Sequence, residues 1–593
     1  MVKNLLFFFA LFVPVALIAQ EESKSTEQFV EEIAQKVPQL LYDFSIPGAA
    51  IAIIEDGEIV LQKGYGFADI EKGVKVTPKT GFNIGSISKT VAAWGVMKLV
   101  QEGKIDLDAP AENYLTRWHL PESEFDSDKV TVRRLLSHTA GLSIPSIGAG
   151  LSYDNLPTLE EWLNGKNDVG SVEIILEPGT KWEYSGGGYA VLQLIIEEVS
   201  GQKFVDFMQT EVLDPLGMTN SSYKIDDKIM AASAITHDPF GEPTEFELYA
   251  IHAAAGFQST LEDFIRFAFA SFPGHKDHLK YNTVLPLETV KQMQEPQPHT
   301  RVGGWKYGLG YQSVHIETDG KEHVFIGHSG SNNGWQASFR LYPATNSGFI
   351  VFTNGGAGDN ICNPLFCELM KWKSGAAWGG CWRKLSIASN LHRIIEDKGL
   401  EEMAASYWAV KKAQGDELDF SEGQLNNLGY HYMAKGELEK AIAVFKLNIE
   451  AFPYAYNVYD SYGEALLETG NREEAVENYK YSVKLNPNNE NGIKVLKGLG
   501  ESTDDLLFKV PVEQLQHLKG EYLATHDEGW RIVVEADGGV LKCEDKYYKF
   551  TLVPIGDDKF VNPRFGALWR FDTNDPDAKP VMLFGEYKFQ KVK

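Results

Sequence analysis

The segment Gly85-Ser86-Ile87-Ser88-Lys89-Thr90 opens an apolar run that continues through Val100, a pattern typical of a buried helix. At helical pitch Ser86 and Lys89 lie on one face, about one turn apart, so the Lys89 amine can reach the Ser86 hydroxyl. Apolar surroundings and the positive end of the helix dipole both disfavour a charged ammonium. The pattern therefore predicts Ser86 as a nucleophile, Lys89 as its base and the Ser86 N–H as an oxyanion donor.

The Ser-x-x-Lys string is a weak signal by itself, because Ser200 and Ser221 begin the same string elsewhere. Ser200 precedes Gly201 at the end of an apolar helix, and Ser221 lies in a polar cluster typical of a turn. Only Ser86 starts a long helix predicted to be buried. The alternative is that Ser86 is an N-cap serine and that Lys89 points to solvent.

A glycine-rich loop contains Tyr184, immediately before the predicted helix Ala190–Val199. Such a loop brings backbone close to a bound molecule, and a tyrosine flanked by cations can ionise partly and carry protons. The alternative is a packed aromatic side chain.

Another chemical stretch, Val324–Ser331, leads into alternating residues that predict a half-buried strand, Trp335–Leu341. Glycines on either side of His328 and Ser329 leave an edge of backbone against which a ligand can lie. The alternative for His328 is a structural hydrogen bond. Ser137 and His138 are adjacent and do not normally face each other, so they predict a helix-ending turn.

These motifs together form a set that resembles the class C β-lactamase and DD-peptidase family of serine hydrolases. The motifs are Ser86-Ile87-Ser88-Lys89, Tyr184-Ser185-Gly186 and His328-Ser329-Gly330, and the resemblance spans roughly residues 44–354. It implies an α+β fold in which an antiparallel sheet is flanked by helices, with an all-helical insertion and the site between the two.

The resemblance also implies roles for the motif residues. Ser86 would attack a carbonyl and form an acyl-enzyme, while Lys89 and Tyr184 would move protons. His328 would hold the positive charge that many relatives supply with lysine. The Ser331 N–H would join that of Ser86 in the oxyanion hole. Substrate would lie against four residues: Ser329, Gly330, Ser331 and Gly186.

Gly186 departs from the family pattern, which has asparagine two residues after the tyrosine. The loss removes one or two substrate hydrogen bonds, each worth roughly 0.5–1.5 kcal/mol net. This departure weakens the case for β-lactams or peptides as substrates and favours ester hydrolysis. No cofactor is implied, and without a His-Glu-x-x-His or clustered Cys/His pattern the sequence predicts no metal.

Composition and the N-terminus indicate where the protein works. A formal charge of −26 argues against nucleic acid or anionic membrane as partners. Residues 1–19 are typical of a cleaved secretory signal, which predicts a periplasmic or secreted protein without stable membrane insertion. Four cysteines are too few for a disulfide framework, although one bridge from Cys381 to Cys362 or Cys367 suits an oxidising compartment.

The rest of the chain predicts further parts. The hydrolase domain is expected over 25–373 and a linker over 374–384. Helices over 385–501 resemble tetratricopeptide repeats, because Leu428-Gly429 and Tyr462-Gly463 repeat after 34 residues. Short β-like runs over 508–593 resemble a lipocalin-like, barrel-type domain.

The prediction is an exported serine hydrolase acting on an ester or amide: a D-amino-acid peptide, a β-lactam or a short ester. The alternative is an inactive hydrolase fold that presents its repeats to a peptide or protein partner. Whether the repeats bind a peptide or act as a spacer between two domains is open, and we favour the spacer.

Overall fold

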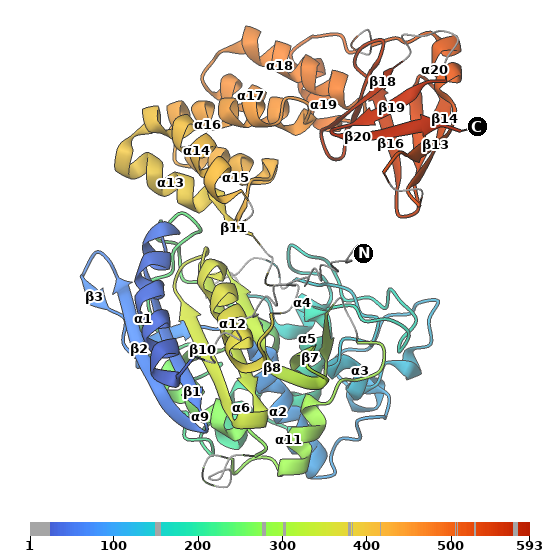
Figure 1. Cartoon of the computed structure of the whole chain (residues 1–593). Helices are drawn as coiled ribbons and strands as arrows, with labels where there is room; N and C mark the ends of the chain where they lie inside the picture. Colours follow the sequence, from blue (N-terminus) through green and yellow to red (C-terminus); the bar gives the residue numbers. More distant parts are fainter. Residues whose placement is uncertain are drawn as a thin grey trace, which may run out of the picture. The chain divides into compact units, whose positions relative to one another are not determined.

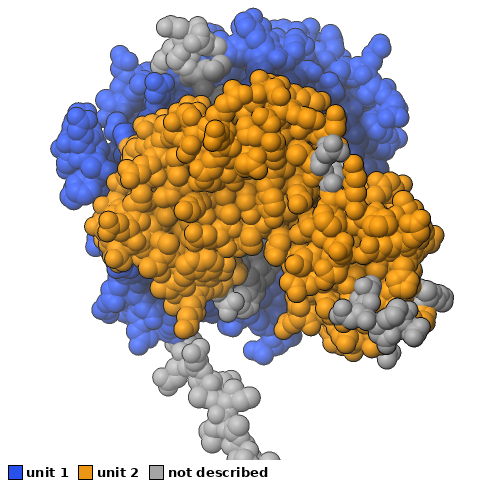
Figure 2. All heavy atoms as spheres, turned by 90° about the horizontal axis from the view of Figure 1, so that it is seen from above, with its two compact units in different colours: residues 1–41, 47–237, 243–381 blue, residues 42–46, 238–242, 382–593 orange. Residues whose placement is uncertain are grey.

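The computed structural model describes residues 24–146, 148, 156–274, 280, 282–300, 304–377, 381, 384–415, 417–504, 506, 508–526, 529–572 and 579–592. The predicted signal segment, 1–19, lies outside these residues. The chain forms two units, coloured separately in Figure 2. The first comprises residues 1–41, 47–237 and 243–381, and the second comprises 42–46, 238–242 and 382–593.

The first unit is built on an eight-stranded antiparallel sheet of order β3-β2-β1-β10-β9-β8-β7-β6. A hairpin joins β1 (Gly48–Glu55) to β2 (Glu58–Asp69) through Asp56 and Gly57. Both linking residues have positive φ, 50° and 75°, as a type I′ turn requires. The remaining strands are β3 (Val74–Lys75), β6 (Trp305–Tyr307), β7 (Gln312–Thr318), β8 (Lys321–Asn332), β9 (Trp335–Tyr342) and β10 (Ser347–Thr353).

Helices from both ends of the first unit pack together beside this sheet (Figure 1). Phe29 of α1 (Thr26–Asp43) stacks on Trp372 of α12 (Asp359–Ser374), with ring centroids 4.1 Å apart. On β9, Phe339 belongs to the large apolar core, whereas its neighbour Arg340 lies over the ring of Phe366 in α12. Successive side chains of β9 thus point to opposite faces of the sheet, one covered by α12 and the other by the large apolar core.

The core face is covered by the helical part that carries the predicted site. Its main helices are α2 (Ile87–Gln101), α3 (Val132–Leu136), α5 (Gly186–Ser200), α8 (His252–Ala255) and α9 (Leu261–Ala270). Nearly all of α2 is buried, which confirms the helix predicted from its apolar run. The α+β fold with a helical insertion is confirmed.

The second unit contains a helical repeat region and a β-barrel. The helices are α13 (Ile387–Lys398), α14 (Met403–Gln414), α15 (Glu422–Ala434), α16 (Leu438–Ala451), α17 (Tyr456–Glu468), α18 (Arg472–Leu485) and α19 (Glu490–Gly498). A Cβ on Gly429 would lie 2.4 Å from the Phe445 ring, and one on Gly463 would lie 2.9 Å from Tyr479. The same close approach therefore recurs after 34 residues, as the repeat predicts.

The barrel closes because β13 (Gly520–Ala524) pairs with β20 (Tyr587–Lys591). The helix α20 (Val512–Leu518) precedes it. Between them run β14 (Arg531–Asp537), β15 (Val540–Glu544), β16 (Lys549–Pro554), β17 (Lys559–Asn562), β18 (Ala567–Asp572) and β19 (Val581–Phe584). Within the described residues, no helix has the length and hydropathy needed to cross a bilayer.

Candidate active site

Ser86 lies at the start of α2, in a turn held tightly against β8. The Gly85 N–H donates to Asn83 Oδ1 at 2.8 Å, and Gly85 has a φ of 52°. A Cβ at Gly85 would lie 2.4 Å from the Ser331 nitrogen, so glycine permits this approach. The Ser86 hydroxyl makes no hydrogen bond that caps α2, so it is not engaged as a helix cap.

Lys89 points inward from the first turn of α2. Its Nζ donates to Ser86 Oγ at 3.1 Å and to the Ala254 carbonyl at 2.8 Å, and the side chain is 1% exposed. Burial lowers the Lys89 pKa from 10.5 to about 7. The alternative of a solvent-pointing lysine is therefore excluded, and a neutral amine faces the hydroxyl over part of the neutral pH range.

Tyr184 lies beside Lys89 and Ser86. Lys89 Nζ lies 4.9 Å from the centroid of its ring. Burial raises the Tyr184 pKa, while a hydrogen bond with Ser86 acts in the opposite direction. The direction of the Tyr184 pKa is therefore opposite to the expected partial ionisation, because desolvation outweighs the Ser86 hydrogen bond and favours the protonated phenol.

His328 reaches the same residues from β8, but without the positive charge that the resemblance implies. Its Nδ1 donates to the Ser329 carbonyl at 2.5 Å, so Nε2 accepts from the Tyr307 hydroxyl at 3.0 Å. Burial lowers the His328 pKa to about 3. The positive charges of Lys89 and Arg340 act in the same direction, whereas the hydrogen bond to the Ser329 carbonyl opposes them. His328 is thus a neutral, structural neighbour of Tyr184.

The strand β8 supplies the backbone edge that the sequence predicts. Its pairing with β7 ends at Gly327, whereas its pairing with β9 continues to Asn332. A Cβ on Gly330 would lie 1.8 Å from the Ile84 carbonyl oxygen and 3.1 Å from the Ser86 nitrogen. The backbone at Ser86 therefore lies close to the backbone at Gly330 and Ser331.

The side chains around this edge differ in what they offer. Ser331 is exposed, and its hydroxyl accepts from Gln336 at 2.8 Å. Ser329 is half-buried, and its hydroxyl accepts from Arg340 at 2.7 Å, which holds this group toward the α12 side. Gly186 is buried, with its N–H donating to the Ile144 carbonyl at 2.7 Å.

His138 is a site residue whose importance the sequence analysis missed. It follows the C-cap Ser137 of α3 with a φ of 59°, which confirms the predicted turn. Its Nδ1 accepts the Ser185 N–H at 3.1 Å, and its ring lies 4.3 Å from that of Tyr184. His138 thus fixes the loop that positions Tyr184, and the adjacent placement of Ser137 and His138 gave no signal of this.

A cavity of 320 Å³ adjoins the turn that carries Ser86. One of its walls is Asn83, which also accepts the Gly85 N–H. The rest of the lining is mixed. Apolar side chains come from Leu156, Val205, Ile225, Phe246 and Leu248, and charged ones from Lys203, Asp206, Lys224 and Glu247. Such a lining combines an apolar surface with a few polar groups that can orient a small ligand.

Gly330→Ala tests the close approach of α2 and β8. The new methyl group meets backbone rather than a movable side chain, so we expect a loss of about 3 kcal/mol in unfolding free energy. Chemical denaturation measures it, with Gly423→Ala as control because a Cβ there meets nothing within 4 Å. Equal stability of Gly330→Ala and the wild type would contradict the packing described here.

The chain is similar in sequence and fold to several known proteins. The sequence profile described as Beta-lactamase matches residues 31–361, and a Tetratricopeptide repeat profile matches 456–489. Protein flp of Staphylococcus aureus (strain N315) is 27% identical over 343 residues, covering 56% of this chain and 64% of the relative. The putative penicillin-binding protein PbpX of Bacillus subtilis (strain 168) is 30% identical over 210 residues, covering 35% of this chain and 49% of that protein.

The matches therefore span less than two thirds of each of these two relatives. Among solved structures, the octameric penicillin-binding protein homologue from Pyrococcus abyssi has a TM-score of 0.48 at 20% identity, covering 95% of this chain and 100% of its own. The D-alanine carboxypeptidase AmpC from Burkholderia cenocepacia has a TM-score of 0.48 at 19% identity, covering 58% and 99%. Because the Beta-lactamase profile spans more than half of the 593 residues, the chain belongs to the beta-lactamase family.

Proposed function

We propose that this protein is a serine hydrolase that works through an acyl-enzyme on Ser86. The observation that carries the proposal is the Lys89 amine, 3.1 Å from Ser86 Oγ and with a pKa lowered to about 7 by burial. A general base is most effective when its pKa lies near the working pH. A buried amine without a carboxylate partner destabilises the fold, so its position beside Ser86 favours a functional role over a structural one.

Acylation follows from the positions of these groups. The Ser86 oxygen bonds to the substrate carbonyl carbon as its proton passes to Lys89 Nζ. The Ser86 and Ser331 N–H groups stabilise the negative charge that develops on the carbonyl oxygen. The protonated phenol of Tyr184 donates to the leaving alkoxide or amine and is reprotonated from the Lys89 ammonium, so the proton lost by Ser86 leaves with the product.

Deacylation repeats these steps with water as the nucleophile. Water adds to the acyl carbon and gives a proton to the same base, and Ser86 recovers a proton as the acid departs. His328 takes no part in these transfers, because it is neutral and its two ring nitrogens are bonded to Ser329 and Tyr307. Its role is to hold the Tyr307 hydroxyl.

Among substrates we propose an ester with an apolar acyl group, ahead of peptides and β-lactams. Gly186 places no amide side chain beside the site, and its N–H is bonded to Ile144. An ester needs no partner for a substrate N–H, so it loses less from this departure than an amide does. The apolar side chains of the cavity beside Asn83 would contact the acyl chain.

A fluorophosphonate probe tests the proposal, because it forms a covalent bond with an activated serine. Digestion and mass mapping of the full chain should place the adduct on Ser86. Ser200→Ala is the control, since it removes the serine of another Ser-x-x-Lys string at the end of α5. An unlabelled Ser86 would leave the alternative, an inactive fold that presents its repeats to a partner.

Ile225→Trp tests the acyl cavity. Ile225 is half-buried and lines the cavity, so the larger ring takes up part of its 320 Å³. We expect kcat/KM for an octanoyl ester to fall about 10- to 100-fold while an acetyl ester is unaffected, the range that a few methylene groups command in an apolar pocket. Ile175→Trp, at an exposed position outside the cavity, is the control. Equal loss for both esters would rule out chain-length selection here.

We also propose that the protein is exported to the periplasm or beyond. The signal-like residues 1–19 support this, as does the disulfide between Cys367 and Cys381. Such bonds persist in oxidising compartments and are rare in the cytosol. The bridge is one of the two pairings that the sequence left open.

A further inference from the structure

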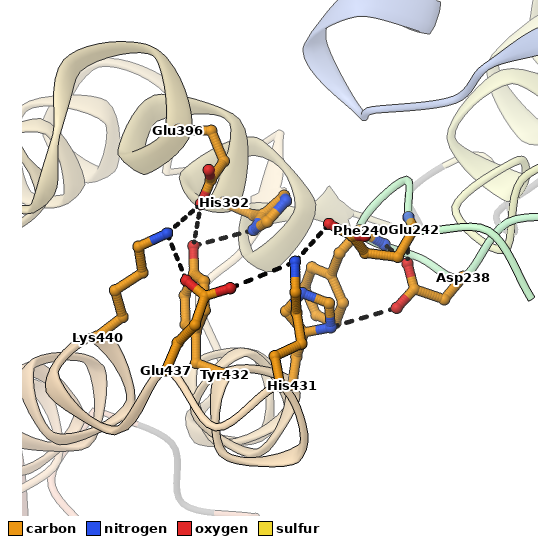
Figure 3. A network of polar contacts seen from close by, with 10 residues as sticks. Asp238, Phe240, Glu242, His392, Glu396, His431, Tyr432, Glu437 and Lys440 are labelled. Carbon is orange, nitrogen blue, oxygen red and sulfur yellow. Dashed lines mark hydrogen bonds and ion pairs between the residues drawn. The ribbon is translucent and has the colours of Figure 1, made fainter. Parts of the chain in front are cut away.

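Three side chains with metal-ligating chemistry meet inside the second unit (Figure 3). Glu242 comes from the short segment 238–242, His392 from α13 and His431 from α15. One ligand atom from each lies within 4.8 Å of the others. The three positions are far apart in the sequence, so no motif reports their meeting.

His431 has a buried ring nitrogen that no described residue contacts by a hydrogen bond. Its Nδ1 lies 3.2 Å from Asp238 Oδ2, and because a carboxylate accepts, Nδ1 carries the proton. In the neutral imidazole, Nε2 then has a free lone pair. It is buried without a hydrogen-bond partner among the described residues, on a side chain only 7% exposed. A buried polar atom in this state is rare and calls for a ligand.

His392 is oriented in the same way. Its Nδ1 lies 2.9 Å from the Tyr432 hydroxyl, which itself donates to Glu396 at 3.3 Å. The tyrosine proton is thus directed to Glu396, and His392 Nδ1–H donates to the tyrosine oxygen. Its Nε2 is left as the unprotonated nitrogen. Metal-binding histidines have this arrangement, in which a carboxylate or similar acceptor holds the other ring N–H.

The charge around the two histidines favours a cation. Lys435 bonds Glu242 Oε1 at 2.6 Å, and it also has Glu437 at 3.3 Å as a second partner. Glu242 keeps a second carboxylate oxygen for another bond. The ionised groups of the network are four carboxylates against two ammonium groups: Asp238, Glu242, Glu396 and Glu437, with Lys435 and Lys440.

We propose that Glu242, His392 and His431 bind a Zn²⁺ ion, with water as the fourth ligand. Two imidazoles and a carboxylate are ligands that zinc takes in proteins. Zinc–ligand distances of about 2.0–2.2 Å require the three atoms to close by about 1 Å. The Glu242 side chain, 42% exposed, has room for this movement. The ion fastens the segment 238–242 to α13 and α15, and it revises the expectation of no metal.

Direct binding of the metal tests the proposal on the full chain after treatment with EDTA and desalting. We expect one equivalent of Zn²⁺ by calorimetry, a Zn²⁺-dependent rise in Tm, and visible absorption of four-coordinate Co²⁺. His392→Gln, His431→Gln and Glu242→Gln should each abolish the Co²⁺ band. His517→Gln, at an exposed histidine of α20, should leave it unchanged. Absence of stoichiometric binding, or ligand variants that bind like the wild type, would overturn the site.

Asp238→Asn is a sharper variant, because it changes no ligand. Asp238 Oδ1 accepts the N–H groups of Phe240 and Glu242, which an asparagine oxygen can also do. The amide nitrogen would then face His431 Nδ1 and move the ring proton to Nε2, blocking the lone pair. We expect the affinity for Zn²⁺ to fall about 10- to 100-fold, with an unchanged circular dichroism spectrum. Unchanged affinity in this variant would refute the proposed orientation and with it the site.

Discussion

Ser86→Ala is expected to abolish ester hydrolysis, lowering kcat on the order of 10⁶-fold, the scale of losing a catalytic serine. Without the hydroxyl there is no oxygen to form the acyl-enzyme, while the oxyanion N–H groups remain. The substitution removes one half-buried oxygen that makes no capping bond, so stability should change little. Steady-state rates with a short acyl ester measure the effect.

Ser200→Ala provides the matched comparison and should keep wild-type kinetics. It is the last residue of α5, and its hydroxyl accepts only the local Gln202 N–H among the described contacts. Comparable hydrolysis by Ser86→Ala and the wild type would mean that another group is the nucleophile, and the proposed mechanism would have to be abandoned.

Lys89→Met is expected to lower the acylation rate about 10²- to 10⁴-fold, the usual contribution of a general base. Methionine fills nearly the same volume in the buried site but accepts no proton. The wild-type rate should rise with pH through about 7, because Lys89 acts as a base only after losing its proton. The variant should lack that rise. Single-turnover acylation between pH 5 and 9 provides both measurements.

The control for this variant is Lys98→Met on the same helix, where the amine is partly exposed and pairs with Glu102 at 3.1 Å. It should retain both the rate and the pH profile. An unaltered profile in Lys89→Met would show that some other group titrates near pH 7.

The stability of Lys89→Met gives an independent check on the lysine. Because the folded pKa of about 7 lies below the ordinary 10.5, the unfolded chain binds more protons between these values. The free energy of unfolding of the wild type therefore rises with pH across that window. The buried Lys89 amine destabilises the fold most below pH 7, where it is charged. The stability advantage of Lys89→Met should accordingly shrink as pH increases from 7 to 10.5 in denaturant titrations.

Local patterns predicted the parts of this fold that depend on neighbours in sequence. Asp56 and Gly57 specify a hairpin because both tolerate positive φ, and Ser86 and Lys89 share a helix face because of helical pitch. The recurring glycines at 429 and 463 revealed the repeats, since each must admit an aromatic ring of the next helix.

Properties that depend on burial were not predictable in this way. The neutral state of His328 and the raised pKa of Tyr184 follow from desolvation by residues distant in sequence. The same holds for His138, whose partner Ser185 is 47 residues away. Glu242, His392 and His431 meet only because the chain segment 238–242 joins the second unit.

The bridge between Cys367 and Cys381 has a mechanical consequence. Cys381 is the last residue of the first unit, and Cys367 lies within α12, 14 residues earlier. Tension on the C-terminal half would pass through the sulfur atoms into the middle of α12 instead of peeling away its final turns. Reduction would add this short length of chain to the extension released when the protein is stretched.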